Sequence, residues 1–283
     1  TGLIVEGGGM KCAYSAGILD RFLDDKITFD YCIGVSAGAA NTLSYLAGQR
    51  GRNLRFYTVH LDDPRYLSVR SLLRTGNLFG LEYIYGTLTN SDGADPIDYD
   101  AIMKNPAEFY MPATDALTGK AAYFSKFDIV RDDYRTIMAT CALPAFCRPV
   151  NVNGHFYYDG GVADSIPIIR SLKTGHRKNV IILTRNFGYR KKEGTRGWEL
   201  YVAAFRKYPN LVRALVNRAK HYNQVLECIE KWEEEGSVFV IRPEIPAVSR
   251  LEKDEERLRE FYQHGYDQMK ANFEALQEFL KEE

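Results

Sequence analysis

The feature that most constrains the fold occurs twice near the start of the sequence: a short apolar segment that runs into glycines and then into a helix-forming segment. Residues 2–5 are apolar and run into the glycines at 7–9, and residues 12–25 then carry small and apolar residues at helical spacing. The pattern returns in residues 31–47, around Gly34. Because buried apolar strands that alternate with helices are typical of parallel sheets, the sequence predicts an α/β fold.

Strands and helices continue to alternate through most of the remaining chain. Further strands are expected near residues 108–112, 121–127, 156–158, 180–184 and 238–241. Apolar residues recur at helical spacing over residues 211–229 and again over 258–280, which predicts two long C-terminal helices that dock on the core. The sequence contains neither an internal repeat nor a linker, so we expect a single domain over residues 1–283.

Composition narrows the class of protein. A chain of 283 residues that is 45% hydrophobic and 26% charged is typical of a soluble globular protein and not of a disordered or membrane-spanning one. The 37 basic and 37 acidic side chains cancel, which disfavours nucleic acid as a partner. The five cysteines form no C-x-x-C pair and follow no signal-peptide pattern, so we expect a cytoplasmic protein.

Charge is balanced over the whole chain but not along it. Residues 170–220 contain 14 Lys or Arg and 2 Asp or Glu, whereas residues 221–283 contain 8 and 16. Either the two segments neutralise each other as solvated helical faces, or the basic segment makes a weak peripheral contact with an anionic membrane. The basic groups considered for that contact are Arg190, Lys191, Lys192, Arg196, Arg206, Lys207, Arg213 and Arg218.

The most informative motif is a G-x-S-x-G pattern over residues 34–38, with an apolar strand before it and a helix former after it. This setting is typical of a nucleophile elbow, in which Ser36 is exposed at a helix N-terminus while Gly34 and Gly38 permit a crowded turn. The motif is short, and a serine that only caps an ordinary helix is the alternative interpretation.

A second glycine cluster, Gly7, Gly8 and Gly9, directly follows the first strand and precedes Lys11. Successive glycine N–H groups beside a helix N-terminus suit an anion. A phosphate site is one interpretation, although neither the P-loop nor the dinucleotide-binding motif is present. An oxyanion hole beside Ser36 is the other, and it explains both glycine clusters by one reaction because a tetrahedral acyl intermediate needs N–H donors.

A nucleophilic serine also needs a base. Asp159 is the better candidate, because it ends a short aromatic strand and is followed by Gly160 and Gly161, which let the chain turn away sharply. The alternative is a structural Asp-Gly turn. The five histidines have no comparable setting; they are His60, His155, His176, His221 and His264.

Together these three segments resemble the patatin-like phospholipases, which carry a glycine-rich loop after the first strand, an early G-x-S-x-G and a D-G-G/A motif. Residues 139–146 are similar to the family's small-residue and proline segment, and the resemblance covers about residues 2–184. It implies a three-layer α/β/α fold with a mostly parallel central sheet and a Ser-Asp dyad, with Ser36 as nucleophile and Asp159 as base. It also implies an oxyanion hole lined by the N–H groups of Gly7, Gly8 and Gly9.

The sequence departs from the family pattern at three positions. Lys11 stands where the family usually has arginine, Cys12 where it has glycine, and Ser165 where asparagine is common. We expect catalysis to survive these changes and substrate preference to be affected. The helical part over residues 198–283 carries no recognised motif and is expected to pack on the motif-bearing part.

The sequence therefore predicts a hydrolase that cleaves acyl esters of lipids, phospholipids included, through an acyl-serine intermediate. No spacing of His, Cys, Asp or Glu indicates a metal site, and the implied reaction needs no cofactor. One alternative is a carboxylesterase of the α/β-hydrolase type with a Ser-His-Asp triad, although Ser36 comes early for that fold. The other is a catalytically inert lipid- or acyl-binding protein.

Overall fold

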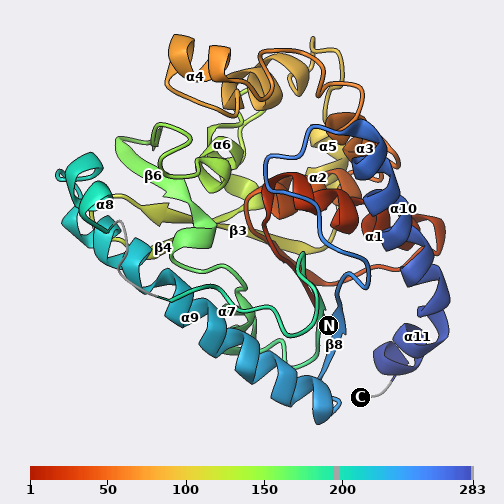
Figure 1. Ribbon diagram of the computed structural model, residues 1–283. Helices are drawn as coiled ribbons and strands as arrows, with labels where there is room; N and C mark the ends of the chain where they lie inside the picture. The colour runs from red at the N-terminus through yellow and green to blue at the C-terminus, as the bar shows by residue number, and fades with distance from the viewer. Residues whose placement is uncertain (194–197, 282–283) are drawn as a thin grey trace.

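A single sheet runs through the centre of the protein (Figure 1), as seen in a computed structural model that describes residues 1–193 and 198–281. Over these residues the sheet has eight strands, in the order β5-β6-β3-β2-β1-β7-β8, with β4 also paired to β3. The strands are β1 (Gly2–Val5), β2 (Tyr31–Gly34), β3 (Glu108–Asp115), β4 (Ala121–Ser125), β5 (Val150–Val152), β6 (His155–Asp159), β7 (Asn179–Ile182) and β8 (Val238–Ile241). The pairs from β3 through β2, β1 and β7 to β8 are parallel, whereas β4, β5 and β6 pair antiparallel.

Helices connect the strands and cover the sheet. They are α1 (Ala13–Asp24), α2 (Ala37–Leu46), α3 (Arg52–Tyr57), α4 (Val69–Thr75), α5 (Tyr99–Lys104), α6 (Arg135–Cys141), α7 (Ile168–Lys173), α8 (Trp198–Ala204), α9 (Pro209–Glu234), α10 (Glu255–Ala271) and α11 (Phe273–Lys281). Shorter helical turns are η1 (Gly9–Cys12), the π-helix η2 (Glu82–Leu88), η3 (Lys126–Asp128) and η4 (Gly160–Val162). No helix in the described ranges is long and apolar enough to cross a membrane.

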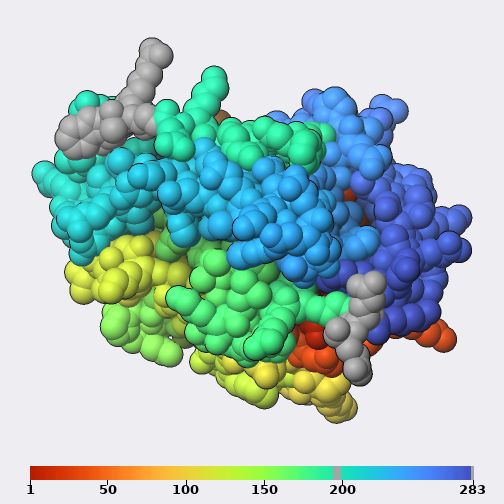
Figure 2. All heavy atoms as spheres, turned by 90° about the horizontal axis from the view of Figure 1, so that it is seen from below, coloured from red at the N-terminus to blue at the C-terminus, as the bar shows by residue number. Residues whose placement is uncertain are grey.

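The alternation of side chains along β1 divides the core into two layers. Leu3 and Val5 belong to the apolar cluster on the side of α1, α2 and α10, whereas Ile4 belongs to the cluster that contains Tyr222 and Ile229 of α9. Figure 1 shows these helices on opposite faces of the sheet, and Figure 2 shows α9 lying across one of those faces. The expected three-layer α/β/α fold with a mostly parallel sheet is confirmed.

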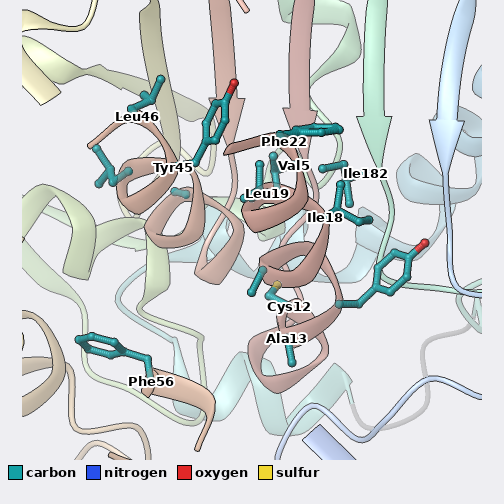
Figure 3. Packing of buried hydrophobic residues seen from close by; sticks show 14 of the residues in the cluster. Val5, Cys12, Ala13, Ile18, Leu19, Phe22, Tyr45, Leu46, Phe56 and Ile182 are labelled. Atoms are coloured by element: carbon teal, nitrogen blue, oxygen red, sulfur yellow. The ribbon is translucent and has the colours of Figure 1, made fainter. Parts of the chain in front are cut away.

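The larger layer is packed by the apolar face of α1. Ile18, Leu19 and Phe22 are fully buried and point toward the sheet, where Val5 and Ile182 lie (Figure 3). Burying a side chain of this size contributes about 1.5–3 kcal/mol relative to exposure, so this face alone holds α1 firmly against the strands. The first helix therefore fixes the position of the glycine turn that precedes it.

The outer face of α1 contacts α10 with very little space between the two backbones. A Cβ atom on Gly17 would lie 2.0 Å from the carbonyl oxygen of Tyr262, and one on Gly265 would lie 2.3 Å from that of Tyr14. Any larger side chain at either position would force the helices apart. The C-terminal segment is thus joined to the first helix by a close backbone contact.

The expected elements are largely observed, with several differences. The strand expected over residues 121–127 ends at Ser125, and the short helices α3, α4 and α5 were not expected. β3 extends to Asp115, three residues beyond the expected strand end. The three-residue strand β5 was not foreseen, because Val150–Val152 is too short to show a period. The second predicted C-terminal helix is wrong as one element, since α10 ends at Ala271 and α11 begins at Phe273.

Candidate active site

Ser36 occupies a strained turn between β2 and α2. Its backbone has φ 55° and ψ −132°, a combination that non-glycine residues rarely adopt and that costs on the order of 1–3 kcal/mol. The Ser36 N–H donates to the Oγ1 atom of Thr140 at 3.1 Å, and the Thr140 hydroxyl donates to the carbonyl of Pro112 at 2.6 Å. The strain and its support are those of a nucleophile elbow.

Both motif glycines of the turn are required because neighbouring backbone atoms leave no room for a Cβ atom. A Cβ atom on Gly34 would lie 2.6 Å from Cα of Ala39, and one on Gly38 would lie 2.6 Å from the carbonyl oxygen of Glu6. The elbow is therefore packed against the end of β1. Gly34 and Gly38 thus allow the close packing that fixes the position of Ser36.

The glycine loop lies directly against this elbow. A Cβ atom on Gly7 would lie 2.8 Å from Cβ of Ser36, so the two motifs predicted separately from the sequence are in contact. In the part of the chain that the structure describes, the N–H groups of Gly7, Gly8 and Gly9 have no protein acceptor. They are free to bind an oxygen atom of a substrate.

The far side of the glycine loop is held by the C-terminal segment. The carbonyl oxygen of Arg250 accepts the Met10 N–H at 3.1 Å, and a Cβ atom on Gly9 would lie 2.7 Å from that oxygen. Gly9 also has φ +60°, which favours glycine. The loop is thus fixed between the elbow and the segment that precedes α10.

Asp159 reaches Ser36 through the sheet. β6 ends at Asp159, which pairs with Ala113 of β3, and β3 in turn pairs with β2. The Ser36 hydroxyl donates to Oδ2 of Asp159 at 2.6 Å. The other carboxylate oxygen, Oδ1, accepts the Gly161 N–H at 2.7 Å. With both oxygens engaged and only 4% of the residue exposed, the carboxylate is held in one orientation toward the serine.

Gly160 and Gly161 allow the sharp turn after β6. A Cβ atom on Gly160 would lie 2.0 Å from the carbonyl oxygen of Pro112, and one on Gly161 would lie 3.0 Å from Oδ1 of Asp159. The hydroxyl of Thr114 also donates to the backbone carbonyl of Asp159 at 2.8 Å. Thr140 and Thr114 thus hold the backbones of Ser36 and Asp159, and the sequence pattern did not point to either threonine.

A cavity opens beside the dyad, and most of the predicted residues line it. Ser36, Asp159 and Gly161 are in its wall, together with the loop at 7–9 and Lys11. Apolar side chains from a different part of the chain line another portion of the wall; they include Phe56, Tyr66, Leu81, Ile84 and Leu143. The arrangement provides an apolar region and a polar region around one nucleophile.

Lys11 is buried and does not lie on the solvated surface. Only 3% of the residue is exposed, and burial, followed by the nearby charges of Arg185 and Arg250, lowers the pKa of its ammonium from 10.5 to about 7. Lys11 is therefore a titratable group in the wall of the cavity.

The basic groups considered for a membrane contact separate into different environments. Lys191 and Arg218 line the cavity. Arg190 forms an ion pair with Glu230 at 2.6 Å, and Arg196 lies outside the described residues. The groups that remain exposed are Lys192, Arg206, Lys207 and Arg213.

All five histidines lie in the described part of the chain, and none of them lines the cavity. His60 contacts Asp95 at 3.0 Å, His176 stacks on Tyr31, and His264 accepts a backbone N–H. Over residues 1–193 and 198–281, no group of three or more His, Cys, Asp or Glu side chains could hold a metal ion. The side chains hydrogen bonded to Ser36 in the described residues are therefore those of Asp159 and Thr140.

Comparison with known proteins identifies the family of this chain. A family model for patatin-like phospholipases matches residues 3–170, more than half of the chain. The chain belongs to the patatin-like phospholipase family. A second model, a domain of unknown function (DUF6363), matches residues 208–281, which contain α9, β8, α10 and α11.

Individual relatives add little about function. The uncharacterized protein YjjU of Escherichia coli is 26% identical over 275 residues, which cover 93% of this chain and 74% of that protein. The crystal structure of VipD from Legionella pneumophila matches with a TM-score of 0.48 and 13% identity, over 97% of this chain and 67% of that one. Membership of the patatin-like phospholipase family makes the protein part of a group of lipid hydrolases.

Proposed function

We propose that the protein hydrolyses acyl esters of lipids, phospholipids included, with Ser36 as nucleophile and Asp159 as general base. The observation that carries this proposal is the 2.6 Å hydrogen bond from the Ser36 hydroxyl to Oδ2 of Asp159, at a strained elbow in the wall of a cavity. Membership of the patatin-like phospholipase family supports the same reaction class.

In the first half of the proposed reaction, Oγ of Ser36 attacks the ester carbonyl carbon while its proton passes to Oδ2 of Asp159. The negative charge that develops on the carbonyl oxygen is stabilised by N–H groups of Gly7, Gly8 and Gly9. Collapse of the tetrahedral intermediate breaks the bond to the alcohol, which leaves with the proton from Asp159. An acyl-serine remains.

In the second half, Asp159 takes a proton from water, and the resulting hydroxide attacks the acyl carbon. The same N–H groups stabilise the second tetrahedral intermediate. Ser36 leaves with the proton from Asp159, and the fatty acid is released. The Gly161 N–H on Oδ1 keeps the carboxylate aligned through both steps without taking part in proton transfer.

The two alternatives from the sequence have less support. A Ser-His-Asp triad requires a histidine beside the serine, and the five histidines all lie away from the cavity wall. An inert binding protein would have no need of a serine held at φ 55° and hydrogen bonded to a buried carboxylate.

A fluorophosphonate probe tests the nucleophile. The wild type should be labelled at Ser36, and Ser36→Ala should remain folded while its kcat with a p-nitrophenyl ester falls by orders of magnitude. More than a tenth of wild-type kcat in Ser36→Ala, or no labelling of the wild type, would contradict the assignment.

A weak peripheral contact with anionic membranes is part of the proposal, because the ester substrate of a phospholipase lies in a bilayer. The exposed cations Arg206 and Lys207 lie between α8 and α9, and Arg213 lies near the start of α9. Leu200 and Val202 of α8 are exposed as well. Each cation near an anionic surface contributes about 1 kcal/mol. A cytoplasmic location and a single domain over residues 1–283 remain predictions.

A further inference from the structure

Cationic side chains from distant parts of the chain meet in the wall of the cavity that contains Ser36. Those without an ion pair in the described residues are Lys11, Arg185, Lys191, Arg218 and Arg250; the wall also contains Arg52, which lies 3.6 Å from Asp95. Of the five, only Lys11 lies within the residues that match the patatin-like family model. The other four come from the loops that follow β7, from α9 and from the segment before α10. This portion of the wall is therefore supplied by residues 185–250 and not by the family motifs.

Protein carboxylates offset only part of this charge, because the wall contains two of them for the five cations. The acidic residues in the wall are Glu6 and Asp159. Glu6 accepts the Thr184 N–H at 2.7 Å and the Tyr222 hydroxyl at 2.8 Å, while Asp159 is bound by Ser36 and Gly161. Across residues 1–193 and 198–281, none of the five cations forms an ion pair.

The cations are close enough to repel one another. Burial, followed by the charge of Arg218, lowers the pKa of Lys191 well below its ordinary value. Burial, followed by the charge of Arg250, lowers the pKa of Arg218. Lys11 behaves in the same way toward Arg185 and Arg250. Cations that outnumber their counter-charges cost free energy when they are held together, and an anion bound among them would reduce that cost.

This cluster lies next to the catalytic dyad. The Arg218 Nε–H donates to the carbonyl oxygen of Gly161, the residue whose N–H holds Asp159. The ammonium of Lys191 lies 3.3 Å from Oγ of Ser165, and that hydroxyl also donates to the Gly161 carbonyl, at 2.6 Å. An anion bound by these groups would therefore lie beside the ester that Ser36 attacks.

We propose that Lys11, Arg185, Lys191, Arg218 and Arg250 form a subsite for a phosphate group of the substrate, and that the preferred substrates are acyl esters with a phosphomonoester close to the ester bond. This inference rests on the proposed hydrolase function. A phosphomonoester carries a charge of about −1.5 to −2 near neutral pH and accepts several charge-assisted hydrogen bonds. A neutral ester would leave the cations unpaired.

The apolar part of the wall complements this subsite. Phe56, Leu81 and Leu143 offer a region for the acyl chain, and they come from segments that contribute none of the five cations. A substrate with its phosphate among the cations and its acyl chain along these side chains has its ester at Ser36. The two regions together orient the substrate, so that the acyl chain is released as the fatty acid and the phosphate stays on the alcohol product.

The first test compares two water-soluble, short-chain acyl esters of glycerol, one with a phosphomonoester on the alcohol part and one with a hydroxyl in its place. The wild type should have at least tenfold higher kcat/KM for the phosphate-bearing ester. Arg185→Gln should lower that value about tenfold and change kcat/KM for the neutral ester less than twofold. Thermal unfolding of each variant reports whether it is folded.

Lys220→Gln is the matched control, because Lys220 is exposed on α9, two residues after Arg218. It removes one positive charge from the same helix and should leave both esters unaffected. Equal loss on both esters in Arg185→Gln, or a wild type without preference for the phosphate-bearing ester, would overturn the subsite.

Calorimetric titration with inorganic phosphate separates this inference from the proposed hydrolysis. Wild type and Ser36→Ala should both bind phosphate, and Arg250→Gln should bind it at least tenfold more weakly. Phosphate binding without hydrolysis of either ester supports the subsite and contradicts the proposed function. Hydrolysis without phosphate binding overturns the subsite alone. Binding of inorganic phosphate without preference for the phosphate-bearing ester overturns the assignment to a substrate group.

Discussion

Lys11→Met should stabilise the protein near neutral pH, and the gain should shrink as pH rises. The folded chain releases the Lys11 proton near pH 7, whereas the unfolded chain keeps it up to about pH 10.5. Between these values the unfolded state binds more protons than the folded state. The free energy of unfolding therefore rises with pH, which means that Lys11 destabilises the folded protein less at high pH than at low pH. Below pH 7 the full cost of the buried ammonium is present.

The magnitude follows from the difference between the two pKa values. At about 1.36 kcal/mol per unit, the shift of Lys11 from 10.5 to about 7 corresponds to an upper limit of roughly 5 kcal/mol at pH 6. At pH 9 the same linkage leaves roughly 2 kcal/mol, because the folded chain is by then neutral at this position. The advantage of Lys11→Met over the wild type should therefore fall by roughly 3 kcal/mol between pH 6 and pH 9.

Urea unfolding of wild type and variant at pH 6, 7.5 and 9 measures this difference, and comparison at each pH cancels the titration of all other groups that the substitution leaves unchanged. Lys220→Met is the control, since Lys220 is exposed and its substitution should give a difference independent of pH. A difference for Lys11→Met that stays constant from pH 6 to pH 9 would refute the reasoning.

Three further predictions concern the reaction and the membrane. Asp159→Asn should be nearly as inactive as Ser36→Ala with a p-nitrophenyl ester, while alanine at each of the five histidines should retain activity; an inactive histidine variant would instead support a triad. Lys11→Met should lower kcat/KM about tenfold at pH 6 if the charge of Lys11 is worth about 1.4 kcal/mol in the transition state. This effect should diminish above pH 7, because the wild-type side chain is neutral there. An unchanged kcat/KM at pH 6 would show that Lys11 takes no part in the reaction. In vesicle sedimentation, the wild type should pellet with anionic and not with neutral vesicles, and this binding should weaken at high salt and when Arg206, Lys207 and Arg213 are changed to Gln; equal pelleting in all conditions would exclude the membrane contact.

The sequence predicted those parts of the site that depend on close backbone approach. Gly7, Gly34 and Gly38 are needed because the elbow and the end of β1 leave no room for a Cβ atom, and such positions leave a visible pattern of glycines. Asp159 was found for a related reason, because the turn after β6 passes close to Pro112 and requires Gly160. Local sequence therefore pointed to Ser36, Asp159 and the glycine loop, which the structure brings together.

The cationic wall could not be predicted in the same way. Lys191 and Arg218 stand among many other basic residues, and only the packing of α9 on the sheet distinguishes them from exposed neighbours such as Arg213. Arg250 lies in a segment with no period at all. Residues that meet only through tertiary contacts leave no local pattern. The short helices between residues 52 and 104 were also missed, because no local pattern of apolar residues marked them.

The contact between Arg250 and the glycine loop bears on how this protein could have been assembled in evolution. A fragment that ended before α9 would retain Ser36 and Asp159, but it would lose the carbonyl that accepts the Met10 N–H and the residues that cover Gly9. The partners of Gly17 on α10 would be lost with it. The C-terminal segment is therefore no interchangeable accessory, and any recombination that replaced it would have had to rebuild the contacts of Gly9 and Gly17 together with Arg218, Tyr222 and Arg250 in the cavity wall.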